Sequence, residues 1–395
     1  MKHLLLICDA FPPAFAPRMG NLCKFLGEFD ITVVTADSNS QNWPMDLPQN
    51  VTVHRFGLTS KWAIVNLFYK LCNYAFSLDD RRLYAKASRA LAGQKFDSVL
   101  CASFYIFPLL CGAKMAKRLQ IPLVVDLRDI VEQYAQPVGF QKFTSFFKLR
   151  WLNRWRRNRL LRLADVVTTV SPWHVAELQK YNSHIRLIYN GFDAAEFYPS
   201  AVKSDKFTIT YTGRLLGGAY QNPTLFFEAM RKLCTDEKFR ENVCVRWFVD
   251  ADSARQISLL AQQFGIGGCT ELNALVSAKE IPDILRASSV VLVLTEKSTA
   301  NGPHGVMTTK FFEALGCEKP VLCVRSDEGC LAEVVRQTNA GVAATNVAEV
   351  EQFLRKKYAE WQQNGYTHQP VNQTEKAKFS RQTQAQQFAE IFEKL

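Results

Sequence analysis

The sequence lacks long apolar runs, paired cysteine motifs and internal repeats. No window of 18 uninterrupted apolar residues occurs in its 395 residues, so we predict no transmembrane helix. The 11 cysteines include no C-x-x-C spacing, and no His/Cys pattern is typical of a metal ligand set. The opening run MKHLLLICDAFPP is interrupted too early for a signal peptide and predicts a first strand. We therefore expect a cytoplasmic protein with reduced thiols, no metal ion and no cofactor.

The composition indicates a folded protein with an anionic partner. Hydrophobic residues make up 48% of the chain and charged residues 22%, which is ordinary for a globular protein. A chain of 395 residues is too long for one core and predicts two domains. The formal net charge of +11 favours a nucleic acid, an acidic membrane surface or anionic substrates.

A strand–loop–helix–strand unit in the C-terminal half is the most informative stretch. The apolar runs at 289–294 and 321–324 predict two buried parallel strands. Between them, Asn-Gly-Pro predicts a turn, and Thr308 or Thr309 offers a hydroxyl N-cap to a short helix that ends at Gly316. This is the βαβ unit of an open α/β sheet, in which ligands bind at the carboxyl ends of the strands.

The loop and the first turns of this helix have the chemistry of a phosphate site. Backbone N–H groups at a positive helix end, with Lys310 in the first turn, suit a phosphate. Glu313 lies one turn further and could accept hydrogen bonds from the vicinal diol of a ribose. By periodicity alone, both residues fit a solvated helix surface equally well.

The run GVMTTKFFEALGCEKPVL resembles the donor-binding signature of GT-B glycosyltransferases of family 4. The usual family pattern has two glutamates eight apart; Glu313 matches the second, which holds the nucleotide ribose, and the first falls at Gly305. Some members that contact donor-sugar hydroxyls through backbone amides share this G-x4-K-x2-E form. The resemblance implies that the donor is bound by the residues before the helix: His304, Gly305, Val306, Met307, Thr308 and Thr309.

The first strand–helix unit also resembles the family's N-terminal domain. Its F-P-P-x4-R run precedes a helix expected at 21–29 and the strand ITVVT. Many members carry Gly-Gly in this loop near the donor phosphates, whereas Ala16 and Pro17 stand here. Arg18 either supplies charge to the diphosphate or acceptor, or faces solvent.

Charged residues follow the strand predicted at 122–127. Such residues at the carboxyl end of a strand indicate a functional position in α/β sheets. Many family members have a His-Asp pair at this place, where this sequence has Arg128 and Asp129. Asp129 could accept a hydrogen bond from the acceptor hydroxyl, and Arg128 could pair with phosphate or with Asp126. The alternative is a structural Arg–Asp ion pair that braces the loop.

The second domain opens with a strand predicted at 207–212. Gly213 and Arg214 follow it, and then a Gly-Gly loop, which together make a natural phosphate cradle. The family has a basic residue at the matching strand end that neutralises the leaving diphosphate, and Arg214 matches it.

The domain organisation follows from a linker and the last helix. A polar stretch at 199–206 comes after the family-like interdomain motif I-x-N-G-F-D. We predict an acceptor domain over 1–198, a donor domain over 199–374, and a final amphipathic segment, 375–395, that crosses back to the first domain. The resemblance implies the GT-B architecture, an α/β fold of two Rossmann-like, doubly wound parallel sheets that face each other across a cleft.

A basic and aromatic segment lies in the N-terminal half. Residues 133–164 contain no Asp or Glu, and their aromatic residues alternate with eight basic ones: Lys142, Lys148, Arg150, Arg154, Arg156, Arg157, Arg159 and Arg162. This pattern is typical of a membrane-surface segment, and we expect residues 140–157 to contact an anionic membrane. The alternative is a basic outer face on a core helix.

The resemblance implies a retaining, metal-independent transfer of a sugar from a UDP- or GDP-sugar to a hydroxyl acceptor. The candidate catalytic residues are Asp129, Arg214, Lys310 and Glu313. A lipid-linked glycan at the cytoplasmic face of the inner membrane, as in capsule, O-antigen or exopolysaccharide synthesis, fits the basic segment.

Three other functions remain open. A sugar-nucleotide epimerase of the same fold would need acid/base groups in the cleft, yet histidine is nearly absent there apart from His304. A nucleic-acid protein would spread its basic residues along a groove, whereas here they concentrate in one segment, so we expect no nucleic-acid partner. An inactive member is the third, because Gly305 and Ala16-Pro17 depart from the family pattern.

Overall fold

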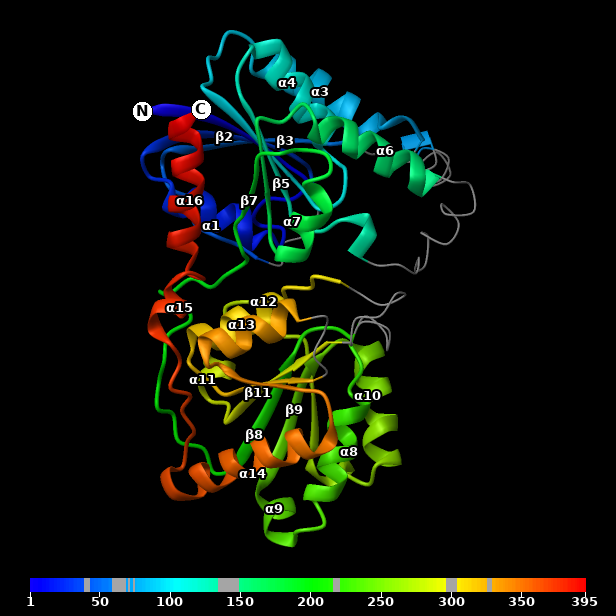
Figure 1. Cartoon of the computed structure of the whole chain (residues 1–395), viewed down its shortest axis with the longest axis vertical. Coiled ribbons are helices and arrows are strands. Elements are labelled where there is room, and N and C mark those ends of the chain that lie inside the picture. Colours follow the sequence, from blue (N-terminus) through cyan, green and yellow to red (C-terminus); the bar gives the residue numbers. More distant parts are fainter. Residues whose placement is uncertain are drawn as a thin grey trace. The chain divides into compact units, whose positions relative to one another are not determined.

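The computed structural model describes residues 1–38, 43–58, 69, 72–73, 75–133, 149–215, 221–295, 304–324 and 329–395. The chain forms two compact units (Figure 1). The N-terminal unit comprises Met1–Tyr189 and Arg381–Leu395, and the C-terminal unit comprises Asn190–Ser380.

The N-terminal unit is built on a parallel sheet of seven strands in the order β3-β2-β1-β4-β5-β6-β7. The direction of winding reverses beside β1, which makes the sheet doubly wound. The strand bounds are β1 (Lys2–Cys8), β2 (Phe29–Ala36), β3 (Val51–Phe56), β4 (Ser98–Ser103), β5 (Leu123–Leu127), β6 (Val166–Thr169) and β7 (Ile185–Leu187).

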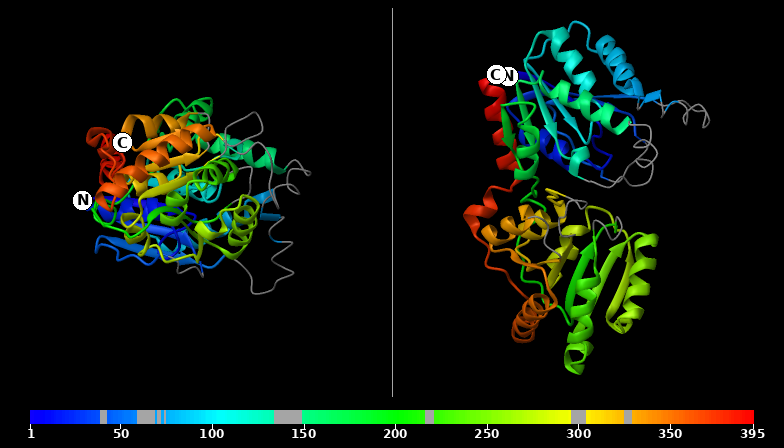
Figure 2. Two further views of the ribbon diagram at one scale, coloured as in Figure 1. Left: turned by 90° about the horizontal axis from the view of Figure 1, so that it is seen from below. Right: turned by 45° about the vertical axis from the view of Figure 1, so that its right-hand side comes forward.

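Helices cover both faces of this sheet, because apolar side chains leave each central strand on alternate sides. Leu5 and Ile7 of β1 pack against α3 (Leu78–Ala90), α4 (Leu109–Leu119), α6 (Leu149–Leu161) and α7 (Pro172–Leu178). Leu4 and Leu6 face α1 (Pro17–Phe25) and the last helix, α16 (Arg381–Lys394). Helix α16, red in Figures 1 and 2, lies alongside α1, so this segment does return to the first unit.

The C-terminal unit has a parallel sheet of six strands in the order β10-β9-β8-β11-β12-β13. Its winding reverses between β8 and β11, which brings the carboxyl ends of these two strands together at a switch point. The strand bounds are β8 (Phe207–Thr212), β9 (Val243–Val249), β10 (Thr270–Ala274), β11 (Val290–Leu294), β12 (Val321–Val324) and β13 (Gly341–Ala344).

Helices lie on both faces of the second sheet as well (Figure 1). Trp247 and its neighbours pack against α8 (Thr224–Leu233), α10 (Ala251–Gln263) and α14 (Val347–Asn364). The opposite face is covered by α11 (Ile281–Arg286), α12 (Thr309–Gly316) and α13 (Cys330–Thr338). Two shorter helices complete the unit: α9 (Glu237–Asn242) and α15 (Gln373–Ala377).

The first unit ends before the boundary that the linker predicted. A Cβ on Gly316 of α12 would lie 2.7 Å from side-chain atoms of both Phe192 and Phe197, so these aromatics pack on the second unit. The segment 190–198 therefore belongs to the C-terminal unit, and the chain returns to the N-terminal unit at Arg381 rather than at 375. Among the described helices, none combines the length and apolar composition that a bilayer crossing needs.

Candidate functional site

Lys310, Tyr211 and Gly213 meet at the carboxyl edge of the C-terminal sheet. Lys310 stands in the first turn of α12, and its Nζ lies 3.4 Å from the Tyr211 hydroxyl and 5.0 Å from the centroid of the Tyr211 ring. Gly213 follows β8 with a φ of +102°, and a Cβ there would lie 2.7 Å from Lys310 Cε. Glycine is therefore required at this position both for backbone conformation and for space.

The Lys310 ammonium is the central charge of this edge. Removal from water lowers the pKa of Lys310 to about 8, and Glu313, one turn further along α12, partly opposes this effect. The lysine stays protonated at neutral pH, beside the positive end of a helix. Thr308 occupies the N-cap position, but its hydroxyl does not cap the helix, so that prediction is wrong.

Arg214 follows Gly213 and is held only loosely. Its Nε lies 3.3 Å from Asp250 Oδ2, and 66% of its side chain is exposed. An exposed pair of this kind contributes little to stability, about 0–1 kcal/mol, so the guanidinium can be redirected to a ligand at small cost. The Arg214 carbonyl accepts a hydrogen bond of 3.0 Å from the Tyr211 hydroxyl, which ties this strand end to the Lys310 cluster.

The loop before α12 carries the other predicted donor-binding residues. Gly305 is buried with a φ of +60°, which glycine adopts without strain. The Met307 carbonyl accepts a hydrogen bond of 3.3 Å from Asn190 Nδ2, and this contact anchors the loop to the start of the unit. The remaining predicted residues are half-buried: His304, Val306, Thr308, Thr309 and Glu313. The preceding Asn-Gly-Pro turn lies outside the described residues.

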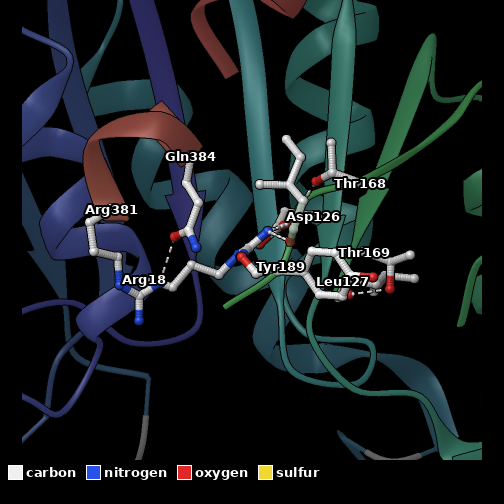
Figure 3. Close-up of polar contacts among 9 residues, drawn as sticks. Arg18, Asp126, Leu127, Thr168, Thr169, Tyr189, Arg381 and Gln384 are labelled. Atoms are coloured by element: carbon white, nitrogen blue, oxygen red, sulfur yellow. Dashed lines mark hydrogen bonds and ion pairs between the residues drawn. The ribbon is translucent and has the colours of Figure 1, made fainter. Parts of the chain in front are cut away.

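Arg18 lies in a buried ion pair of the N-terminal unit (Figure 3). Its Nε and Nη2 donate to the two carboxylate oxygens of Asp126 at 2.9 and 2.8 Å, and its other bonds go to the carbonyls of Ile188 and Tyr189. The Thr168 hydroxyl donates to Asp126 at 2.6 Å. Arg18 is 3% exposed and Asp126 0%. Arg18 therefore neither faces solvent nor offers charge to a substrate, and its role is structural.

Arg128 forms a different pair from the one predicted. Its Nη2 donates to both carboxylate oxygens of Asp9, at 2.7 and 2.9 Å, whereas Asp126 is occupied by Arg18. Burial raises the pKa of Asp9, against the lowering effect of Arg128. Asp9 directly follows β1 and Arg128 follows β5, so both stand at the carboxyl edge of the first sheet. Arg128 Nε has no hydrogen-bond partner among the described residues.

Asp129 ends a chain of hydrogen bonds that sequence reasoning missed. Gln133 bonds the Asp129 carboxylate and accepts, at 3.3 Å, from His174 Nε2. His174 Nδ1 lies 2.6 Å from the Ser171 hydroxyl. Burial lowers the pKa of His174 to about 4, so the ring is neutral and carries its proton on Nε2. Burial also raises the pKa of Asp129 to about 6, against the lowering effects of Arg128 and Gln133.

The loop that carries Asp129 is braced from α6. Arg157, which is buried, donates from Nη1 and Nη2 to the two carboxylate oxygens of Glu132, at 2.7 Å each. Glu132 belongs to a short 3-10 helix, Val131–Gln133. This bidentate pair fixes the turn between Asp129 and Gln133 and therefore holds the first two members of the hydrogen-bond chain.

In the part of the chain that the structure describes, no three His, Cys, Asp or Glu side chains gather in an arrangement that could hold a metal ion. The cations available at both edges are lysine and arginine side chains.

Comparisons with known proteins agree with this architecture. Residues 16–196 match the family model of Glycosyltransferase Family 4. A sucrose-phosphate synthase from Thermosynechococcus elongatus aligns with 100% of this chain and 99% of its own, at a TM-score of 0.69 and 14% identity. The chain has the GT-B fold. The resemblance to GT-B glycosyltransferases of the family 4 kind is thus confirmed.

Two further GT-B structures cover the whole chain. Anabaena Alr3699/HepE in complex with UDP-glucose has a TM-score of 0.64 and 18% identity over 100% of both chains. The lipopolysaccharide outer core galactosyltransferase WaaB has a TM-score of 0.59 and 12% identity, also over 100% of both. A search of curated protein sequences returns no match.

Proposed function

We propose that this protein transfers a sugar from a nucleotide-diphosphate sugar to a hydroxyl group of an acceptor. The observation that carries this proposal is the Lys310 cluster. A lysine ammonium is held against Tyr211 over Gly213, at the carboxyl edge of a doubly wound sheet and at the positive end of α12. In open α/β sheets this is the position at which ligands with phosphate groups bind.

The diphosphate is the leaving group in the proposed reaction. The bond between the sugar C1 and the phosphate oxygen breaks, and the bond between C1 and the acceptor oxygen forms. Lys310, Arg214 and the first N–H groups of α12 stabilise the charge that develops on the diphosphate. Glu313 binds the ribose. These fixed cations take the role of a divalent metal, so we expect activity to persist in a chelator.

Asp129 is the residue proposed to orient the acceptor hydroxyl. A carboxylate with a pKa of about 6 is largely ionised at neutral pH and is still basic enough to accept a proton. The acceptor proton goes either to Asp129 or to the departing phosphate. The second route accompanies retention of configuration at C1, which we also propose.

The donor proposal is tested by a thermal-shift panel of UDP, GDP, ADP, dTDP and CMP. A ligand that binds only the folded protein must raise its melting temperature by mass action. We expect UDP or GDP to raise the melting temperature of the wild type and to lose this effect in Glu313→Ala. Glu333→Ala, an exposed glutamate on α13, is the matched control and should respond like the wild type. If no nucleotide shifts the wild type, the glycosyltransferase proposal fails.

The exposed face of α6 favours an acceptor at a membrane surface. Trp151 and Trp155 are exposed, and so are three arginines at helical spacing on the same side: Arg154, Arg159 and Arg162. Aromatic and basic side chains on one helix face bind the interface of anionic bilayers. We therefore propose a lipid-linked glycan at the cytoplasmic membrane face as the acceptor. The predicted stretch 140–148 lies outside the described residues.

Liposome flotation tests the proposal that the protein binds an anionic membrane surface. Wild type should float with anionic vesicles and not with neutral ones, and Trp151→Ser/Trp155→Ser should stay in solution. Leu259→Ser removes an equally exposed apolar side chain from α10 and is the matched control. Equal flotation of all three proteins would remove the membrane proposal. Salt-sensitive binding of RNA or DNA instead would favour the nucleic-acid alternative. Turnover of a UDP-sugar without any acceptor would favour an epimerase.

A further inference from the structure

A cavity of about 160 Å³ lies at the amino edge of the C-terminal sheet, the edge opposite Lys310. Lys319 directly precedes β12, and the Thr367 hydroxyl bonds the carbonyl of Ser289, directly before β11. Because the strands are parallel, their amino ends share one edge. The cavity is lined by Pro199, Ser200, Ala201, Cys317, Glu318, Lys319, Tyr366, Thr367 and His368.

Lys319 brings a buried charge to this cavity. Only 2% of its surface is exposed, and among the described residues its Nζ has one hydrogen bond, of 3.4 Å, to the Ser200 carbonyl. No carboxylate of the described residues lies within ion-pair distance of it. Burial lowers the pKa of Lys319 to about 8, which leaves it protonated at neutral pH. A buried ammonium without a charged partner is unfavourable in the folded protein.

Two nearby lysines of the same unit each have a carboxylate partner. Lys357, also buried, lies 2.9 Å from Glu360 Oε2 and 2.7 Å from the His368 carbonyl. Lys376 Nζ lies 2.7 Å from Glu318 Oε1. Lys319 differs from both because, in the part of the chain that the structure describes, its Nζ bonds only the Ser200 carbonyl, at 3.4 Å.

The acid that lines the cavity is already engaged. The Glu318 carboxylate accepts hydrogen bonds from Lys376 Nζ at 2.7 Å and from Gln373 Nε2 at 2.9 Å. Those contacts lower the pKa of Glu318, so it is ionised and neutralised by Lys376. Its φ of +52° places it in the left-handed region, which is strained for glutamate. The net charge of the cavity wall is therefore positive and comes from Lys319.

We propose that this cavity binds a small oxyanion of the size of inorganic phosphate, with the Lys319 ammonium as its main partner. An engineered cavity of about 150 Å³ holds benzene, a molecule of six heavy atoms, so the volume suits a five-atom phosphate ion. Tyr366 and Ser200, whose side chains carry hydroxyl groups, are among the lining residues. This site is distinct from the donor site, which lies at the opposite edge of the same sheet.

The test compares Lys319 with an exposed lysine of the same unit, Lys232 of α8. Phosphate is titrated by isothermal calorimetry into the full-length protein saturated with UDP, which occupies the donor site, against sodium chloride of equal ionic strength. A charge-assisted hydrogen bond contributes enough that Lys319→Met should weaken phosphate binding by about tenfold or more. Lys232→Met should leave this binding unchanged. UDP stabilisation of Lys319→Met should match that of the wild type, which separates this proposal from the donor site.

A second variant keeps the test decisive if Lys319→Met does not fold. Ala201 lines the cavity and is exposed, so the larger side chain of Ala201→Phe should occupy cavity space without disturbing the core. It should abolish phosphate binding and retain the UDP response. The proposal is overturned if phosphate binds the wild type no better than chloride does. It is equally overturned if binding survives Ala201→Phe or disappears in Lys232→Met.

Discussion

At the carboxyl edge of the N-terminal sheet, each predicted arginine has a carboxylate partner. Arg18 bonds Asp126 in the core, and Arg128 bonds Asp9. At the same edge of the C-terminal sheet, Lys310 lies against a neutral phenol, and none of the described carboxylates is within ion-pair distance of it. Both units have the same sheet design, so the difference lies in the side chains alone.

This difference separates two uses of charge. A buried pair with complete hydrogen bonding fixes the position of chain segments and leaves no charge for a ligand. A lysine ammonium without a carboxylate partner keeps its positive electrostatic potential. A diphosphate can therefore bind it while few contacts within the protein are lost. In the sequence, Arg18 and Lys310 are similar basic residues, each in the first turn of a helix. Variants of the two residues distinguish these two uses of charge.

The largest expected effect is the loss of the buried pair. Arg18→Met leaves the Asp126 carboxylate buried without its partner, which should destabilise the N-terminal unit by about 3–5 kcal/mol. In scanning calorimetry, the transition of that unit should fall by roughly 6–20 °C. Lys180→Met breaks the exposed pair with Glu177 and should shift the same transition by less than about 2 °C. A similar small shift in Arg18→Met would contradict the structural role.

Lys310→Met should lower activity and leave stability intact, which is the opposite of what is expected for Arg18→Met. Removal of a partly desolvated charge without a carboxylate partner should leave the melting temperature unchanged or raise it. Loss of one preorganised cation at the leaving group should lower kcat by about 10²–10³-fold. Initial rates with the donor identified by the thermal-shift panel measure this effect. The comparison would be reversed if Lys310→Met unfolded while the kcat of its folded fraction stayed at the wild-type value.

Gly213→Ala tests how closely Lys310 depends on the strand end. Alanine at this position combines a φ of +102° with a contact between its Cβ and Lys310 Cε. Together they should displace the ammonium and raise the free energy of the donor-binding conformation by about 1–3 kcal/mol. UDP affinity should fall by roughly 5–150-fold. Gly93→Ala has a similar φ, +82°, with no atom within 4 Å of the new Cβ, and lies in the other unit. It should lower stability and leave UDP affinity unchanged.

The smallest expected effect is a dependence on pH. Lys310 binds a diphosphate as the ammonium form, and its pKa is about 8, so UDP affinity should be full below pH 8 and decline above it. Between pH 8 and 9.5 the loss should approach tenfold per unit. Lys310→Arg keeps its charge throughout this range, so its UDP affinity should stay constant. Calorimetry in both proteins across pH 6.5–9.5 measures the difference.

The strand pattern and the helix at Thr309–Gly316 could be predicted from the sequence, because both depend on local periodicity and turn residues. The helix expected at 21–29 instead spans Pro17–Phe25. Proline at the first helical position is favourable, since its missing N–H would have no partner there. The sequence pattern predicts Pro17 as a loop residue, whereas the helix starts at this proline, one turn earlier than predicted.

The partners of the site residues could not be predicted from local pattern. Arg18 and Asp126 are 108 positions apart, and only the alignment of α1 over β5 brings them together. Tyr211 lies inside a buried strand, where the sequence pattern predicts an ordinary core residue. Only the structure shows its contact with Lys310. The sequence could have indicated Asp9 as a partner of Arg128, because both residues follow strands of the same parallel sheet.

The return of the chain at Arg381 determines the order in which the units can fold during synthesis. Helix α16 contributes Phe388 and Phe392 to the core over α1, and the Phe392 carbonyl accepts a hydrogen bond from Lys2. Its residues emerge from the ribosome only after the whole of 190–380. At about 5–20 residues per second, that delay is roughly 10–40 s. The unit that begins first is therefore completed last, and its apolar α1 face stays uncovered until α16 has been synthesised.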